Sequence, residues 1–231
     1  MIQLWTWPTP NGQKVHVALE ELGLPYQIVP IDIGKGEQFK PEFLAITPNH
    51  RIPAIVDKDG PGGELALFES GAILLYLSEK AGGKLMPKDA AGRAVATQWL
   101  MFQMGGIGPM MGQQGHFSTY APEKIPYAID RYDNEVARLA RVLDKRLGHA
   151  TWLAGTEYSM ADIATFPWTR HLPSRGLDMT ALPHLSRWHA AMEARPGVQR
   201  GLDVMKEQQQ RRALTDAEKE VLFGKKQFEK R

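Results

Sequence analysis

The run Pro8-Thr9-Pro10-Asn11-Gly12 most limits how this chain can fold. It separates a short apolar segment, residues 2–5, from an amphipathic segment that begins at residues 15–19. An apolar run, a turn rich in proline and glycine, and an amphipathic run together predict a strand, a tight loop and a helix. Asn11 stands where a helix N-cap is expected, and the first-turn N–H groups behind it can bind an anion. On this loop alone, a plain helix cap is the simpler interpretation.

The absence of cysteine limits the chemistry as strongly. None of the 231 residues is cysteine, so disulfides, protein thiol nucleophiles and cysteine metal sites are excluded, and any thiol chemistry must use a ligand's sulfur. The net charge of +2 argues against nucleic acid or an anionic membrane as the main partner. Because the chain has neither an apolar run of membrane-spanning length nor a signal-peptide pattern, we expect a cytoplasmic protein.

Residues 1–86 alternate strand-like and helix-like segments. The turn-rich segment 57–64 predicts a hairpin between the last two strands. One helix is expected to end near Leu22-Gly23, and another to occupy residues 69–77. The order βαβ, loop, ββα indicates a small mixed sheet whose first two strands are parallel. The segments that predict its strands are residues 2–5, 26–31, 52–57 and 65–68.

Helical patterns dominate from residue 88 to residue 204. We expect the glycine- and proline-rich run 105–109 to interrupt the first helix. Ser159 and Asp162 form a capping-box pattern before a further helix. The chain should therefore fold as an α/β domain at residues 1–86 followed by an all-α domain at residues 88–204. The clearest helical periodicities are at residues 92–103, 125–147 and 183–194.

Residues 205–231 form a charged tail. Its basic residues, including Arg211-Arg212, are interleaved with acidic ones, which argues against a nucleic-acid role and predicts a mainly solvated segment. Leu214 and the apolar run 221–223 can nevertheless dock as a short amphipathic piece.

Two further pairs of residues allow both a plain and a functional interpretation. Ile52-Pro53 begins a predicted strand, and most such bonds are trans. A cis bond there would turn the Ile52 backbone towards a peptide ligand for strand-like pairing. Glu69-Ser70 can be an ordinary helix start with a serine cap. Alternatively, Ser70 and the helix N-terminus bind a ligand carboxylate while Glu69 binds its ammonium group.

Taken together, these segments resemble a cytosolic glutathione transferase, with a thioredoxin-like N-terminal domain and a helical C-terminal domain. The likeness rests on the initial strand, loop and helix, on ITPNHRIPAI at residues 46–55 and on FESGAILLYL at residues 68–77. More narrowly, the chain is similar to the bacterial Nu class, which is akin to the fungal prion-forming transferase homologue. The likeness covers residues 1–204. The narrower motifs are residues 8–12, 34–39, 105–110 and 125–132.

The resemblance implies a glutathione site. Ile52 should offer its backbone to the cysteinyl part of glutathione beside a cis Pro53. Glu69 and Ser70 should hold the γ-glutamyl end, and Gln38 should contact the tripeptide. Glutathione would be a co-substrate, reduced or as its disulfide, and no metal is implied.

Further residues of the implied site are more dispersed. Arg131 should face a second glutathione, or the second half of glutathione disulfide, although a solvated arginine is the simpler interpretation without the family. Lys40 and Arg51 are candidates for binding the glycine carboxylates. His50 departs from the family, whose loop often has a smaller amide there, and can contact a glutathione carboxylate.

Thr9 and Asn11 are implied to stand beside the sulfur, where most family members have Tyr, Ser or Cys. Hydrogen bonds and a helix N-terminus lower the pKa of a thiol, but an amide takes no proton. That suits thiol–disulfide exchange, in which a bound thiolate attacks a disulfide and a second glutathione resolves the product. The Nu class likewise implies a disulfide-bond reductase. Two alternatives are a conventional transferase that conjugates electrophiles or reduces organic peroxides, and a non-catalytic glutathione-binding regulatory module.

The family also implies a homodimer. Its interface would use the first helices of the all-α domain, around Gln98 and Gln103. Small disulfides or electrophiles would be the other substrates.

Overall fold

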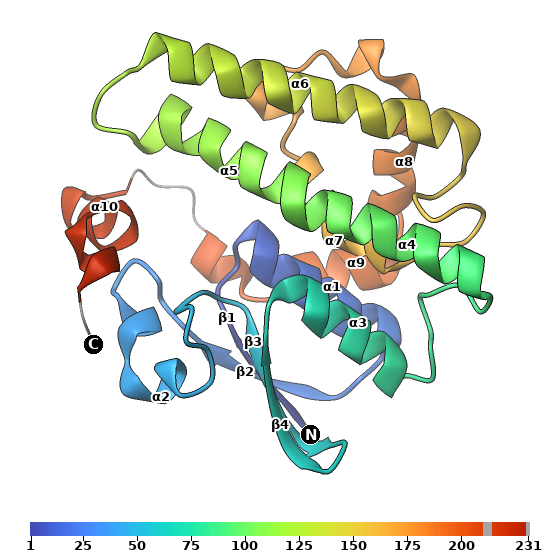
Figure 1. Ribbon diagram of the computed structural model, residues 1–231, viewed down its shortest axis with the longest axis horizontal. Coiled ribbons are helices and arrows are strands. Elements are labelled where there is room, and N and C mark those ends of the chain that lie inside the picture. The colour runs from blue at the N-terminus through green and yellow to red at the C-terminus, as the bar shows by residue number, and fades with distance from the viewer. Residues whose placement is uncertain (210–213, 230–231) are drawn as a thin grey trace.

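The N-terminal half is built on a four-stranded sheet in the order β2-β1-β3-β4 (Figure 1). In this computed structural model, which describes residues 1–209 and 214–229, β1 (Ile2–Thr6) runs parallel to β2 (Tyr26–Pro30). It runs antiparallel to β3 (Ala54–Gly60), which forms a hairpin with β4 (Gly63–Phe68). The predicted mixed sheet with a parallel first pair is confirmed, and with its flanking helices it makes a thioredoxin-like fold.

Helix α1 (Pro10–Leu22) follows β1 after the predicted tight loop. Pro10 occupies the first turn, where its missing N–H costs nothing, and Gly23 ends the helix in the left-handed conformation with φ 66°. The expected N-cap is wrong by two residues, because Thr9 is the cap and Asn11 lies within the first turn. The Thr9 hydroxyl accepts a hydrogen bond from the Gly12 N–H at 3.4 Å, which leaves the Asn11 side chain available for other contacts.

The C-terminal half is all helical, as predicted. The expected interruption at residues 105–109 is wrong, because α4 (Ala90–Phe102) continues through a π-helix (Gln103–Ile107) into α5 (Gly108–Gly115). A π-turn accommodates an extra residue without breaking the helix, and Pro109 lies in the first turn of α5. Further α-helices are α2 (Pro41–Leu44), α3 (Ser70–Lys80), α6 (Pro126–His149), α7 (Met160–Thr169), α8 (Pro183–Glu193) and α9 (Pro196–Asp203).

The predicted capping box starts α7. Ser159 is the N-cap, and the carboxylate of Asp162 accepts hydrogen bonds from both the N–H and the hydroxyl of Ser159. Asp162 also accepts from the Leu153 N–H at 2.9 Å and from the Trp188 indole at 2.8 Å, and it is fully buried. Burial raises the pKa of Asp162, whereas the four donors oppose that rise. The carboxylate thus joins α7 to α8 and to the segment before α7.

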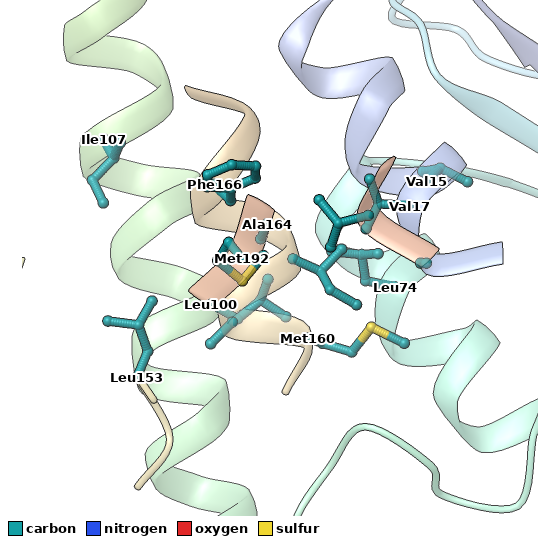
Figure 2. Close-up of a cluster of buried hydrophobic side chains, with 14 of the residues drawn as sticks. Val15, Val17, Leu74, Leu100, Ile107, Leu153, Met160, Ala164, Phe166 and Met192 are labelled. Atoms are coloured by element: carbon teal, nitrogen blue, oxygen red, sulfur yellow. The ribbon is translucent and has the colours of Figure 1, made fainter. Parts of the chain in front are cut away.

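One apolar core joins the two halves. Val15, Val17 and Leu74 from the N-terminal half lie beside Leu100, Met160 and Ala164 from the helices (Figure 2). Helix α1 packs closely on α9, where a Cβ on Gly201 would lie 2.5 Å from Val17 Cα. Ion pairs flank this contact, between Arg195 and Glu21 and between Arg200 and Glu20. The close contact and the two ion pairs together hold α1 against α9.

The charged tail includes a short docked helix, α10 (Asp216–Phe223). Val221 is buried against Gly36 in the loop after β2, and the Phe223 ring lies 4.9 Å from His116 and 5.4 Å from Tyr120. In Figure 1, α10 lies between the α2 region and the end of α5. The expected amphipathic docking is confirmed for these residues, whereas Arg211-Arg212 lie outside the described residues.

His16, in the middle of α1, contacts the end of β1 and makes the fold sensitive to acid. The ring is fully buried, Nε2 lies 3.0 Å from Thr6 Oγ1, and Nδ1 has no partner among the described residues. Burial lowers the pKa of His16 to about 4. Because the unfolded chain binds a proton more readily, the stability from neutral His16 is complete above pH 6.5 and falls as the pH drops towards 4.

We expect the free energy of unfolding to fall by about 2 kcal/mol between pH 7 and pH 5 because of His16 alone. Urea unfolding at the two pH values measures this difference. The variant His16→Gln should have a smaller pH dependence, whereas His149→Gln, at an exposed position in α6, should keep that of the wild type. An unchanged pH dependence in His16→Gln would contradict the assignment.

Candidate functional site

A cavity of about 240 Å³ lies between the start of α1, the start of α3 and the π-helix after α4. It is formed by residues from both halves of the chain. A larger cavity of about 400 Å³, beside Phe166 and Arg170, contains none of the predicted site residues. The smaller cavity is lined by Asn11, Lys14, Glu69, Gln103, Met104, Gly108, Pro109 and Trp168.

Asn11 is held in one orientation by Trp168 of α7. The Trp168 indole Nε1 lies 3.0 Å from Asn11 Oδ1. Because an indole N–H can only donate, the amide oxygen must face Trp168. The Asn11 NH2 group makes no hydrogen bond among the described residues, so it can donate to a ligand in the cavity. The arrangement makes Asn11 a fixed donor, suited to an anion such as a thiolate.

Gly12 allows the loop to approach β1 closely. A Cβ at this position would lie 2.1 Å from the Trp7 carbonyl oxygen and 2.6 Å from Thr6 Oγ1, well inside van der Waals contact. Thr9, the N-cap, accepts from the Gly12 N–H and can still donate its own hydroxyl proton. Thr9 and Asn11 thus both lie at the start of α1, and of the two only Asn11 lines the cavity.

Glu69 and Ser70 lie at the start of α3, on the opposite side of the cavity. Glu69 is the N-cap residue, with φ 69° and no capping hydrogen bond from its side chain, and Ser70 is the first helical residue. The plain interpretation of a serine cap is therefore wrong. Without a side-chain cap, the first-turn N–H groups of α3 can receive an anion. A left-handed conformation is costly for glutamate, which is typical of residues at functional sites.

Lys14 lies in the same cavity, one helical turn after Asn11. Its side chain is only 1% exposed, and Nζ donates to Ser70 Oγ at 3.2 Å and to Met104 Sδ at 3.3 Å. Burial lowers the pKa of Lys14 to about 7, and the nearby charge of Glu69 opposes part of that shift. The cavity therefore contains a buried amine that titrates near neutral pH.

The loop before β3 has the geometry that the resemblance implied. The Ile52–Pro53 peptide bond is cis, and the Ile52 N–H and C=O make no hydrogen bond among the described residues. Buried Gln38 donates to the Ile33 carbonyl at 3.1 Å, while its Oε1 has no partner among the described residues. These backbone and amide groups remain available to a ligand.

Other predicted residues lie away from the cavity lining. Lys40 is exposed and bonds Glu37 at 2.8 Å, and Arg51 is exposed before Ile52. Arg131 is 57% exposed on α6, with Glu135 3.9 Å away. His50 has φ 43°, and its ring lies 5.4 Å from that of Phe39. The geometry assigns none of these four side chains to the cavity.

Gln103 corrects the expected dimer contact. Its side chain is fully buried and lines the cavity, so it does not face outwards as an interface residue, whereas Gln98 on α4 is exposed. Neither the amide oxygen nor the amide nitrogen of Gln103 has a partner among the described residues. The π-helix therefore presents unsatisfied polar groups to the cavity.

Sequence reasoning missed Lys14, Met104 and Trp168. Lys14 could have been found, because it follows Asn11 by three residues and so lies on the same face of α1. Trp168 is 157 residues from Asn11, and no local pattern connects the two. In the part of the chain that the structure describes, no helix is long and apolar enough to cross a membrane.

Comparison with known proteins agrees with this geometry. Residues 1–79 match the glutathione S-transferase N-terminal domain family, and residues 107–196 match its C-terminal domain family. The disulfide-bond oxidoreductase YfcG of Escherichia coli K12 is 50% identical over 204 residues, which cover 87% of this chain and 94% of that protein.

Two solved structures are similarly close. A glutathione transferase from Burkholderia graminis, with two glutathione molecules bound per subunit, has a TM-score of 0.85 and 50% identity, and the match covers 89% of this chain and 88% of that one. A transferase from Pseudomonas putida, with one glutathione disulfide bound per subunit, has a TM-score of 0.82 and 46% identity, covering 88% and 91%. This chain belongs to the glutathione S-transferase family, as its resemblance to the Nu class predicted.

Proposed function

We propose that this protein is a glutathione-dependent disulfide-bond reductase. The observation that carries the proposal is the fixed amide of Asn11, which presents a donor but no base to a cavity at the start of α1. The chain also contains no cysteine, so both attacking thiolates must come from glutathione. YfcG, whose name is that of a disulfide-bond oxidoreductase, gives independent support.

In this mechanism the chain's residues stabilise the thiolate form of glutathione. The Asn11 NH2 group and the Thr9 hydroxyl donate hydrogen bonds to the sulfur, and the positive end of α1 adds to their effect. Each interaction favours the charged form, so together they lower the thiol pKa of bound glutathione. Neither the Asn11 amide nor the Thr9 hydroxyl can accept the thiol proton at neutral pH.

The exchange then proceeds in two balanced displacements. The thiolate attacks one sulfur of the substrate disulfide, forming a mixed disulfide and releasing the other sulfur as a thiolate that takes a proton. A second glutathione thiolate attacks the glutathione sulfur of that mixed disulfide, which forms glutathione disulfide and releases the second substrate thiol. Two glutathiones are oxidised and one disulfide is reduced. The relative with two glutathiones bound per subunit is consistent with room for both.

The remaining contacts would hold the tripeptide. Ile52 would pair its free backbone groups with the cysteinyl part, and Gln38 would use its unpartnered oxygen. Glu69 and Ser70 would bind the γ-glutamyl end at the start of α3. Because Lys40, Arg51 and Arg131 are exposed, they would contact a ligand only where it extends beyond the cavity.

We expect Asn11→Ala to lower the rate of disulfide reduction by about 10- to 100-fold, because it removes one hydrogen bond to a charged group. The assay measures reduction of hydroxyethyl disulfide by glutathione, with glutathione disulfide as the product. Asn134→Ala, an exposed amide on α6, is the matched control and should keep the wild-type rate. Equal rates for Asn11→Ala and the wild type would remove Asn11 from the mechanism.

The same assay separates the alternative functions. A conventional transferase would turn over 1-chloro-2,4-dinitrobenzene or an organic peroxide faster than the disulfide. A regulatory module would bind glutathione tightly and turn over none of these substrates. The lack of a tyrosine, serine or cysteine at positions 9 and 11 favours the disulfide, which needs only a thiolate.

We further propose a cytoplasmic homodimer. Glutathione is kept reduced in the cytosol, which supplies the reductant. Exposed residues of α4, including Gln98 and Met101, would contribute to the interface. The domain limits at residues 1–86 and 88–204, with a tail at 205–231, stay predictions that limited proteolysis can test.

A further inference from the structure

Lys14 is a buried amine without an anionic partner in residues 1–209 and 214–229. Its side chain is 1% exposed, and none of the ion pairs among these residues includes its Nζ. An ammonium group has three protons to donate, and its hydrogen-bond acceptors in the described part of the chain are the Ser70 hydroxyl at 3.2 Å and the Met104 thioether at 3.3 Å. Burying a charge in this way is costly unless another charge compensates it.

The groups around Lys14 are mostly neutral. Glu69, at the start of α3, is the charged group that acts on it, and Glu69 is itself exposed. Asn11 of α1 and Gln103 and Met104 of the π-helix complete its side of the cavity, and none of them carries a charge. Burial therefore dominates, and the pKa of Lys14 falls to about 7.

The position of Lys14 indicates which anion would be its partner. Ser70, its hydrogen-bond partner, is the first residue of α3, whose N-terminal N–H groups have no side-chain cap. A carboxylate at this end of α3 would accept from those N–H groups and from the Ser70 hydroxyl. Since the Ser70 oxygen already accepts from Lys14, its proton is free to turn from Met104, 3.5 Å away, to the carboxylate.

We propose that Lys14 is the buried counter-charge for the ligand carboxylate that binds at the N-terminus of α3. When this carboxylate binds, the Lys14 amine takes up a proton and becomes a full ammonium group. The inference rests on the proposed glutathione site, and it adds a binding residue and a direction of proton transfer. An opposite charge nearby raises the pKa of an amine, so the bound complex holds a proton that the free protein has partly lost.

The test uses S-methylglutathione, which keeps both carboxylates of glutathione but has no thiol proton to release. Calorimetric titrations in two buffers with different ionisation enthalpies give the number of protons taken up on binding. We expect about 0.9 proton per site at pH 8 and about 0.1 at pH 6. The dissociation constant should rise about tenfold between pH 6 and pH 8.

Lys14→Met keeps the length of the side chain and removes its charge. This variant should take up no proton at pH 8, and its dissociation constant should be the same at pH 6 and pH 8. Lys145→Met, at an exposed position on α6, is the matched control and should keep both wild-type values. Proton uptake that persists in Lys14→Met would overturn the proposal.

A direct titration needs no variant to fold. With ¹³C-labelled lysine, one Cε signal should titrate near pH 7 in the free protein and stay that of an ammonium up to pH 8 in the complex. Absence of such a signal would overturn the proposal, as would uptake with glutathione but not with S-methylglutathione. If the wild type binds S-methylglutathione without proton uptake, the proposal for Lys14 is overturned and the proposed function stays intact. If the wild type neither binds S-methylglutathione nor reduces the disulfide, the proposal for Lys14 and the proposed function are both overturned.

Discussion

Gly12→Ala is expected to lower the free energy of unfolding by about 3 kcal/mol, because the added methyl group meets atoms that cannot move away. Its Cβ would lie 2.1 Å from the Trp7 carbonyl oxygen, which belongs to the backbone, and 2.6 Å from Thr6 Oγ1. The start of α1 must then shift from β1 and carry Asn11 with it. Disulfide reduction should therefore fall together with stability, and thermal unfolding should move down by roughly 10 °C.

Gly105→Ala provides the matched control. Gly105 is exposed in the π-helix, and nothing lies within 4 Å of the position that its Cβ would take. Alanine also has the higher helix propensity, so this variant should be as stable as the wild type or slightly more stable. Equal melting temperatures for Gly12→Ala and the wild type would show that the loop tolerates a side chain, contrary to the close approach described above.

Asp162→Ala should destabilise the fold by about 4 kcal/mol, because it leaves several buried donors without an acceptor. The Leu153 N–H and the Trp188 indole lose their partner, as do the N–H and the hydroxyl of Ser159. Urea unfolding measures the loss. We expect the effect on disulfide reduction below the unfolding transition to be small, since Asp162 does not line the cavity.

Asp178→Ala is a control that distinguishes the effect of burial on stability from that of helix capping. Asp178 also accepts hydrogen bonds from the backbone at a helix start, through the Thr180 N–H at 2.9 Å, but it is exposed. Water can replace these bonds, so the loss of stability should be much smaller than that caused by Asp162→Ala. If the two aspartates cost the same, the buried network around Asp162 would contribute nothing beyond an ordinary cap.

Local patterns were sufficient for much of the fold. The alternation of apolar segments and turns placed the four strands to within a few residues, and the spacing of Ser159 and Asp162 identified the start of α7. The same reasoning failed at residues 105–109, since glycine and proline usually end a helix. A π-turn keeps the backbone bonded there, and this segment packs against α6 and α7, which the local sequence does not reveal.

Some features of the site can likewise be predicted from local patterns, whereas others depend on tertiary packing. Thr9, Asn11, Glu69 and Ser70 adjoin turns and helix starts that can be recognised locally, and Asn11 and Glu69 line the same cavity. The hydrogen bond from Trp168 to Asn11 and the inward position of Gln103 could not be predicted, because each depends on how the two halves pack. The N-cap was misplaced for a smaller reason: Pro10 suits the first helical position, which moves the cap back to Thr9.

The packing of α1 against α9 limits how this protein could exchange parts during evolution. Val17 meets the backbone of Gly201, and Glu20 and Glu21 are paired with arginines of the other half. A recombination event that joined this thioredoxin-like half to a different helical half would need a glycine at the same contact and two arginines in register. It would also need an indole to orient Asn11. The two halves should therefore be inherited together, and chimaeras of distant relatives should lose the site even where each half keeps its own fold.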